Sequence, residues 1–222
     1  DVCSSDLDVL AQQALGDGST AAKSIVPSGE ITIDGQDFNH DLSLPFDKTK
    51  AQAYLKKAQD ELGTKKISLN LNLADTDAYR SLSVYLKERI ESVLPDVTIN
   101  INRMPLNAEI SAFNARNFQA GTLSWSTDYN DPIDFLDMAY SDGAINFTKW
   151  QHPDYDQLIQ QINQQGDATT TRFKLEKDAA KLNNDLNGVT PLYQMANVHL
   201  LQSHVRGLTY PVIGYQNYKY AK

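Results

Sequence analysis

A strand–helix–strand pattern in the first half of the chain does most to limit the fold. Residues 67–73 alternate apolar and polar side chains, which predicts a half-buried strand. Residues 77–93 carry apolar side chains at helical spacing, and residues 97–101 alternate once more. Strands joined through a helix almost always pair in parallel with a right-handed crossover. The sequence therefore predicts an α/β fold rather than a helix bundle or a β-sandwich.

Further elements follow from capping residues and from apolar spacing. Asp47 is a suitable N-cap for a helix that Gly63 ends, and Thr76 or Asp77 suits the start of the crossover helix. A helix over residues 106–118 is expected to turn Leu106, Ile110 and Phe113 inward. The remaining expected elements are a helix end within residues 8–24, a strand over residues 121–125, helices that begin at Pro153 and near Thr170, and strands over residues 189–193 and 198–201.

The composition excludes several classes of function. The 222 residues are 41% hydrophobic with a net charge of −8, which suits a folded domain with a sizeable core. Nucleic acids and anionic membranes attract clustered Lys and Arg, so the acidic balance argues against both. No apolar run is long enough to cross a bilayer, the single Cys excludes a disulfide framework, and no phosphate-binding glycine motif occurs. We expect no cofactor and no metal site.

The first seven residues, Asp-Val-Cys-Ser-Ser-Asp-Leu, need a separate explanation. They resemble the translated end of a common DNA-sequencing adapter, so we expect residues 1–7 to be a non-native addition to a truncated gene. On this hypothesis they pack loosely, and their deletion changes stability by less than roughly 0.5 kcal/mol. The native N-terminus, with any export signal, would then be missing. The alternative is a native loop.

Four acids recur at every third position in the most unusual local feature of the chain. They are Asp128, Asp131, Asp134 and Asp137. Their spacing does not fit a calcium-binding loop. Asp131 with the following Pro is typical of a helix start, and the next two acids fit its first turns, where the helix dipole favours negative charge. Asp128 is left over between Trp125 and Tyr129 at an expected strand end, which makes it a candidate ligand contact.

The stretch from Trp125 to Leu136 reads Trp-Ser-Thr-Asp-Tyr-Asn-Asp-Pro-Ile-Asp-Phe-Leu. This pattern, W-x-x-D-Y-x-D/E-P-x-x-F-L, closely resembles the extracellular solute-binding proteins of family 5, the oligopeptide-binding proteins of ABC importers. The order of the surrounding segments agrees as well, so the resemblance runs from about residue 8 to the end of the chain. Residues 50–58 and the strand–helix–strand unit precede the pattern, and residues 153–159, 190–193 and 205–207 follow it.

The resemblance implies a periplasmic-binding-protein-like class II lobe, with a mixed sheet and flanking helices, as a fragment of a two-lobed protein. Residues 8–188 would form most of its C-terminal ligand-binding lobe. Residues 189–222 would supply crossover strands and a tail that packs on the missing N-terminal lobe.

The resemblance also implies a receptor for peptide transport and not an enzyme. Such a protein captures oligopeptides outside the cell membrane, holds them by β-augmentation and delivers them to the permease subunits. By resemblance, Asp128 pairs with the α-ammonium group of the peptide, and Trp125, Ser126, Thr127 and Tyr129 line it. The implied protein is bacterial and monomeric at full length. It is either periplasmic or a lipoprotein held at the outer face of the cytoplasmic membrane by a lipid anchor on the missing N-terminus.

Two alternatives stay open at this point. The same fold could bind nickel or haem, although the sequence offers no His close to Asp128. A hydrolase could use the carboxylates of Asp128 and Asp131, although no second supporting group accompanies them and a helix start already explains Asp131.

Overall fold

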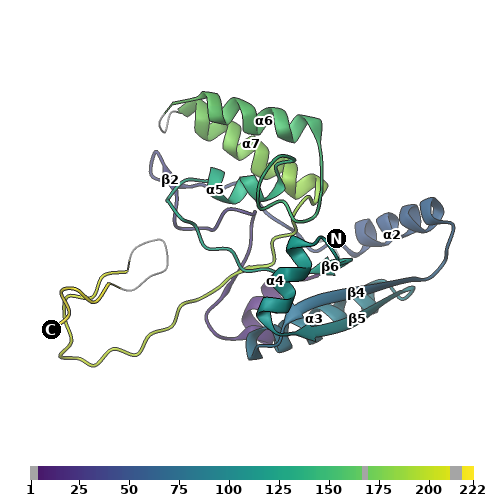
Figure 1. Ribbon diagram of the computed structural model, residues 1–222, viewed down its shortest axis with the longest axis horizontal. Helices are drawn as coiled ribbons and strands as arrows, with labels where there is room; N and C mark the ends of the chain where they lie inside the picture. The colour runs from purple at the N-terminus through teal and green to yellow at the C-terminus, as the bar shows by residue number, and fades with distance from the viewer. Residues whose placement is uncertain (1–4, 167–169, 211–216) are drawn as a thin grey trace.

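The predicted strand–helix–strand unit forms the main sheet of the molecule. The computed structural model describes residues 5–166, 170–210 and 217–222. Strands β4 (Ile67–Ala74) and β5 (Val97–Met104) pair in parallel along their whole length. The short strand β6 (Ala120–Gly121) pairs with the other edge of β4, which gives the order β5-β4-β6. Helix α3 (Asp77–Val93) makes the crossover (Figure 1).

Alternating side chains decide which face of the sheet is buried. Thr76 caps α3, since its hydroxyl accepts a hydrogen bond from the Tyr79 amide at 3.3 Å. The apolar side chains of β4 and β5 are at odd-numbered positions. Because side chains alternate between the two faces along a strand, they lie on the same face of the sheet, where they pack with α3. We call this cluster the sheet core. Its buried members are Leu7, Leu10, Ala51, Leu71, Leu73, Leu82, Leu86, Val93, Leu94, Val97 and Ile99.

The opposite face of the sheet is polar and carries two amide pairs. The parallel register sets Asn70 opposite Asn100 and Asn72 opposite Asn102. The Asn100 amide donates to Asn70 Oδ1 at 3.2 Å, and the Asn102 amide donates to Asn72 Oδ1 at 3.0 Å. We call these two pairs the asparagine ladder. These two hydrogen bonds tie the strands together across the polar face.

A second core lies under the helices that follow the sheet in the sequence. Helices α5 (Ile133–Leu136), α6 (Pro153–Gln164) and α7 (Thr170–Leu186) pack with residues 25–42. That segment contains a hairpin of β2 (Thr32–Ile33) and β3 (Gln36–Asp37), and a 3₁₀ turn, η3 (Asp137–Ala139), follows α5. The helices predicted from Pro153 and from Thr170 are confirmed.

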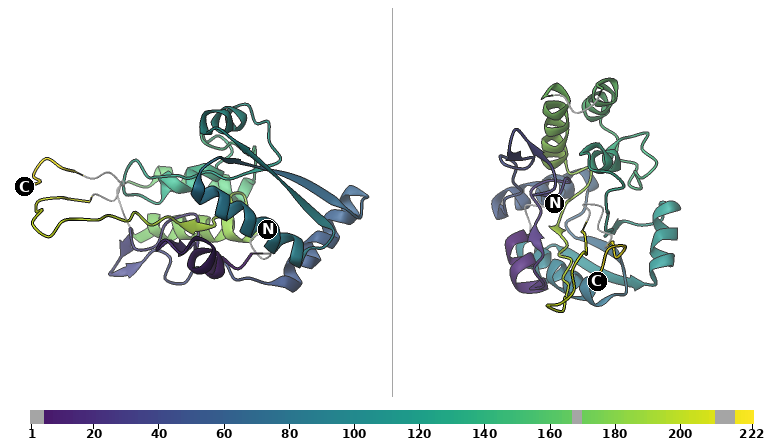
Figure 2. Two further views of the ribbon diagram at one scale, coloured as in Figure 1. Left: turned by 90° about the horizontal axis from the view of Figure 1, so that it is seen from below. Right: turned by 90° about the vertical axis from the view of Figure 1, so that its left-hand side faces the viewer.

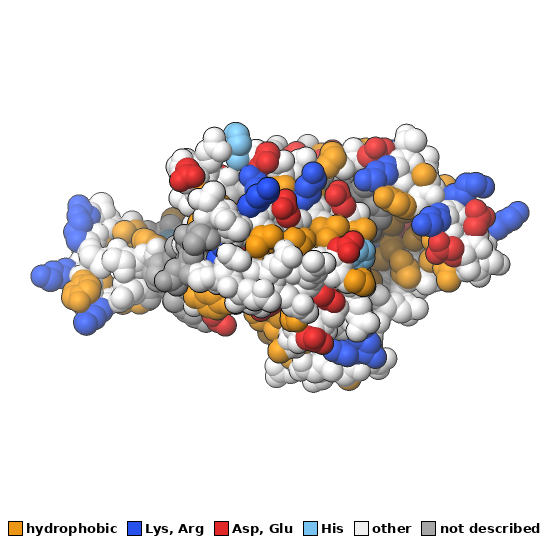
Figure 3. All heavy atoms as spheres, turned by 90° about the horizontal axis from the view of Figure 1, so that it is seen from above, with side chains coloured by type: hydrophobic (Ala, Val, Ile, Leu, Met, Phe, Trp, Pro, Cys, Tyr) orange, Lys and Arg blue, Asp and Glu red, His pale blue; other side chains and the backbone are white. Residues whose placement is uncertain are grey.

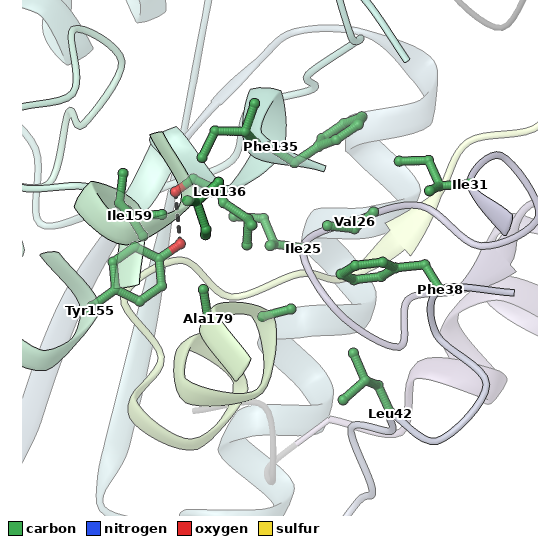
Figure 4. Packing of buried hydrophobic residues seen from close by; sticks show 14 residues of the cluster. Ile25, Val26, Ile31, Phe38, Leu42, Phe135, Leu136, Tyr155, Ile159 and Ala179 are labelled. Atoms are coloured by element: carbon green, nitrogen blue, oxygen red, sulfur yellow. Dashed lines mark hydrogen bonds between the residues drawn. The ribbon is translucent and has the colours of Figure 1, made fainter. Parts of the chain in front are cut away.

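Tyr155 is the largest fully buried side chain of this helical core. It lies among Leu136, Ile159 and Ala179, and its hydroxyl donates to the Leu136 carbonyl at 2.7 Å (Figure 4). The bond ties α6 to the end of α5. The ring therefore fills the core while its one polar atom stays satisfied.

The N-terminal part of the chain joins the two bodies of the molecule, the sheet with its core and the helices with theirs. Helix α1 (Leu7–Val9) and the π-helix η2 (Leu10–Leu15) end at Gly16, which takes a left-handed φ of 62°. The helix end expected within residues 8–24 is thus confirmed. Strand β1 (Thr20–Ala21) then pairs antiparallel with β7 (Tyr193–Gln194), which brings the late chain back beside the start.

Helix α2 (Lys48–Leu62) has the predicted limits. The Asp47 carboxylate accepts from the Lys50 amide at 2.9 Å, and Gly63 ends the helix with a φ of 64°. Of the apolar side chains of this helix, only Ala51 is buried, and Leu62 is 65% exposed. The helix touches the sheet core through Ala51 and the half-buried Leu55, so only part of its apolar side is covered.

Helix α4 (Leu106–Asn114) is shorter than predicted and presents a different face to the core. Phe113 is buried as expected, but Leu106 and Ile110 are exposed, so their predicted inward orientation is wrong. Glu109 is buried in their place, with 1% of its surface exposed. The helix packs against the end of β4, and this contact selects the face that carries Glu109 and Phe113.

The buried carboxyl of Glu109 makes stability depend on pH. Burial raises its pKa from 4.5 to about 7, and a hydrogen bond from the Ala74 backbone only partly opposes this. Between these two pH values the folded state keeps a proton that the unfolded chain has lost, so the free energy of unfolding falls as pH rises through this window.

We therefore expect Glu109→Gln to be about 2 kcal/mol more stable than wild type at pH 8 and nearly unchanged at pH 5. Urea denaturation at both pH values measures this difference. The exposed Glu88→Gln variant on α3 is the matched control. An equal effect of Glu109→Gln at both pH values would contradict the assignment.

Beyond β7 the chain leaves the two bodies as an extended arm, residues 195–209. Figure 2 shows the arm projecting away from the rest of the molecule together with residues 217–222, and Lys and Arg side chains gather at this end (Figure 3). Most of its large apolar side chains are exposed, and Leu200 is fully exposed. The predicted strand over residues 198–201 is wrong, and of residues 189–193 only Tyr193 is in a strand. Residues 211–216 lie outside the described part of the chain.

Residues 5–7 are packed, which contradicts the expectation of a loose N-terminal segment. Leu7 is 4% exposed and belongs to the sheet core, and Ser5 is also buried. The Asp6 side chain caps α1, and its carbonyl accepts from the Tyr85 hydroxyl at 2.5 Å. Residues 1–4 lie outside the described residues, and the adapter origin of residues 1–7 stays a prediction.

Because residues 5–7 are packed, a substitution there should lower the free energy of unfolding measurably, in contrast to the near-zero change expected for a loose segment. We expect Leu7→Ala to lower the free energy of unfolding by about 3 kcal/mol, because it removes a buried side chain and leaves a cavity. Asp8→Ala, one residue along and exposed, should stay within about 0.5 kcal/mol of wild type. Urea denaturation of both variants provides the comparison. A loss below about 0.5 kcal/mol for Leu7→Ala would restore the loose-segment view.

Candidate functional site

A groove separates the sheet from the helical body. It has a volume of about 640 Å³. Three stretches of chain line most of it, namely residues 22–28, 121–127 and 189–197. We call this space the groove. Strand β7 and Ala22, the residue that follows β1, belong to its lining, so the groove runs along the junction of the two bodies.

The segment that follows β6 forms one wall of the groove. The last sheet bond is donated by the Thr122 amide to the Asn72 carbonyl at 3.2 Å. Residues 123–126 then continue without helix or strand structure, so the predicted strand over 121–125 is present only at Gly121. Among the described residues, the backbone of 123–126 makes no hydrogen bond. This wall therefore offers free amide and carbonyl groups beside the groove, as the edge of a sheet does.

Side chains hold this wall in place. Ser124 Oγ lies 2.6 Å from the Tyr79 hydroxyl on α3. Trp125 packs against the helical core, and no partner for its indole nitrogen is found among the described residues. Thr127 is buried, and its hydroxyl both accepts from the Tyr129 amide at 3.2 Å and donates to the Tyr129 carbonyl. The wall is thus anchored at both ends, while its backbone stays open.

The predicted site residues divide into two groups. Trp125, Ser126 and Thr127 line the groove. Asp128 and Tyr129 follow them in an exposed bend at the end of this wall and are not part of the groove lining. No ion pair of Asp128 is found within the described ranges. The bend presents a carboxylate next to the open backbone of 123–126.

The buried carboxylate of Asp134 holds the bend in place. The Asp128 amide donates to Asp134 Oδ2 at 2.9 Å, and Asp134 is only 8% exposed. The helix-start interpretation holds for Asp131, whose Oδ1 accepts from the Ile133 amide at 3.0 Å. Asp134 does not act mainly through the helix dipole, because α5 spans only four residues and its side chain is turned to Asp128.

Arg172 on α7 connects this region to the helical core. Its Nη2 donates to both carboxylate oxygens of Asp131, at 3.0 and 2.9 Å. Its Nη1 donates to the Ile162 carbonyl at the end of α6, at 3.0 Å. Its Nε lies 2.9 Å from Glu176 Oε1 one turn along α7. Burial, together with the nearby Asp131 charge, raises the pKa of Glu176 to about 8.

Sequence reasoning missed Arg172, Glu176 and the role of Asp134. The only signal for the first two was their spacing of four on a helix, which is common on solvated surfaces. Their burial depends on how α7 packs, and that is a tertiary property. Within the described ranges, no group of three or more His, Cys, Asp or Glu side chains is placed to hold a metal ion. No helix in the part of the chain that the structure describes is long and apolar enough to span a membrane.

A parallel sheet, a crossover helix and a groove bordered by an open backbone wall define one lobe of a solute-binding protein. Residues 4–147 match the family described as bacterial extracellular solute-binding proteins, family 5 Middle, and the chain belongs to this family. The resemblance and the α/β lobe expected from the sequence are confirmed.

Several relatives cover nearly the whole chain. The dipeptide-binding protein DppE of Bacillus subtilis is 27% identical over 97% of this chain, which corresponds to 40% of the relative. A dipeptide-binding protein of Lactococcus lactis is 29% identical over 89% of this chain and 37% of its own length. The oligopeptide ABC transporter substrate-binding domain of Bacillus anthracis superposes with a TM-score of 0.91 at 28% identity, over 99% of this chain and 44% of that one. The chain thus spans well under half the length of these relatives.

Proposed function

We propose that this chain is the C-terminal lobe of a receptor that captures oligopeptides outside the cell membrane and delivers them to the permease of an ABC importer. The single observation that carries the proposal is the backbone of residues 123–126, which borders the groove and makes no hydrogen bond among the described residues. An extended peptide beside this wall can pair with it through main-chain bonds alone. Such binding tolerates many side chains.

Asp128 gives this binding a direction. In this proposal the carboxylate of Asp128, on the exposed bend that follows the open wall, meets the first residue of an extended peptide. A carboxylate and an α-ammonium group make a charge-assisted hydrogen bond, which is stronger than a neutral one. Trp125, Ser126, Thr127 and Tyr129 complete the peptide-lining stretch in this proposal.

Residues 8–188 form the ligand-binding lobe in this proposal, and residues 189–222 cross to a second lobe and pack on it. The exposed apolar side chains of the arm support this division, since an uncovered apolar surface of this kind is usually an interface. A lipid anchor or a periplasmic location, the permease subunits as partners, and a monomeric full-length protein belong to the same proposal. The peptide-binding names of the relatives support an oligopeptide over nickel or haem.

The receptor is proposed to bind without turnover, which distinguishes it from a hydrolase. Full-length two-lobed protein is mixed with a free-amine pentapeptide, and calorimetry and mass spectrometry follow binding and cleavage. We expect binding with the peptide intact. A matched pentapeptide with N-methylated backbone amides is the control, and it should bind at least about tenfold more weakly because it cannot pair with the wall. Cleavage, or equal affinity for both peptides, would overturn the proposal.

A further inference from the structure

The bend that carries Asp128 is held by side chains from helices α5 and α7. Its amide is bound by Asp134 of α5 at 2.9 Å. Asp131, which follows the bend, has its amide bound to the Tyr129 carbonyl at 2.9 Å and its carboxylate clamped by Arg172 of α7. Arg172 in turn bonds the end of α6 and faces Glu176, which is fully buried.

These contacts have the features of a rigid support. Two of the carboxylates are almost fully buried, and the Arg172 side chain is only 12% exposed. Arg172 contacts both oxygens of Asp131 through Nη2, while its Nη1 and Nε reach Ile162 and Glu176, so the planar guanidinium is fixed by three groups at once.

We propose that Asp134, Asp131, Arg172 and Glu176 are positioning residues that hold the Asp128 carboxylate in the place where it selects a free peptide α-amine. This inference rests on the proposed function and names how its selectivity is set. Pre-organisation matters here because a carboxylate on a mobile bend would lose part of its binding energy in becoming ordered. None of the four positioning residues needs to touch the peptide.

The measured quantity is amine discrimination, the Kd of an N-acetylated peptide divided by the Kd of the same peptide with a free amine. In the full-length protein, Asp134→Ala should lower this ratio about tenfold, because the Asp128 amide loses its charged acceptor. Asp134→Asn keeps an acceptor oxygen and should recover most of the ratio. Arg172→Lys keeps the charge but loses the planar guanidinium, and it should lower the ratio by about threefold.

Amide hydrogen exchange on the present chain supplies a readout that does not involve peptide. We expect the Asp128 amide to exchange at least about tenfold faster in Asp134→Ala, with the amides of β4 unchanged. A merely structural role would lower the melting temperature of the variants and leave amine discrimination of the folded protein at the wild-type value, which would overturn the inference.

The two proposals fail in different ways. If Asp128→Asn leaves amine discrimination unchanged, Asp128 is not the amine anchor and the proposed function loses its directional element. If Asp128→Asn abolishes discrimination while Asp134→Ala and Arg172→Lys keep it, the anchor stands and the positioning role is wrong.

Discussion

Replacing Asp128 by Asn is expected to weaken binding of a free-amine peptide about 100-fold in the full-length protein, or about 2.7 kcal/mol. The substitution keeps the shape of the side chain and removes its charge. Removing one partner of a buried ion pair costs about 3–5 kcal/mol, and the cost is lower where water still reaches the pair. The exposed bend of Asp128 places the expected value at or below the lower end of that range.

A double-mutant cycle separates direct contact from an indirect effect. N-acetylation of the peptide removes the other charge, so acetylated peptides should bind weakly to wild type and lose little more on Asp128→Asn. The two changes are then strongly non-additive, as groups in contact require. Calorimetry on the four combinations measures the coupling. Additive losses would show that Asp128 does not meet the α-amine.

Tyr155→Ala is expected to be the most destabilising substitution considered, with a loss of about 4 kcal/mol in the free energy of unfolding. The ring is fully buried where α5, α6 and α7 meet, so its removal leaves a large cavity. The Leu136 carbonyl also loses its hydrogen bond.

Tyr155→Phe isolates the effect of the lost hydrogen bond to the Leu136 carbonyl. It keeps the ring and removes the hydroxyl, so it should cost only about 1–1.5 kcal/mol. Urea denaturation of both variants measures the two losses. Equal losses would mean that the hydrogen bond, and not the packing of the ring, dominates at this site.

The sheet was predictable because its evidence is local. Alternation in residues 67–73 and 97–101 sets which side chains are buried, and a connecting helix between them requires a parallel pair. The helix limits at Asp47, Gly63 and Pro153 were predictable for the same reason, since a cap depends on a few neighbouring residues.

Properties that depend on a distant partner were not predictable. Leu106 and Ile110 follow a helical spacing, but α4 meets the sheet through Phe113 and Glu109 instead. Residues 198–201 are apolar enough for a strand and have none to pair with in the described part of the chain. Leu7 lies in a segment with no recognisable pattern, yet it fills a place beside α3.

The candidate site was predictable in part. The resemblance singled out residues 125–129 through a continuous motif, and the structure places the first three of them along the groove. Arg172 lies far from the motif in sequence, and only the packing of α7 brings it to Asp131. The continuous motif thus marks the wall that is proposed to bind the ligand, and the residues proposed to hold it come from elsewhere in the chain.

The asparagine ladder also acts as a register mark for the sheet. Apolar alternation alone forbids a slip of one residue between β4 and β5, because every side chain would change faces, but it tolerates a slip of two. A two-residue slip in one direction would set Asn72, which is only 7% exposed, opposite Met104, and in the other it would set Asn102 opposite Ala74. Either slip removes an amide pair, so misaligned strands are distinguished from the native pairing by polar side chains on the open face.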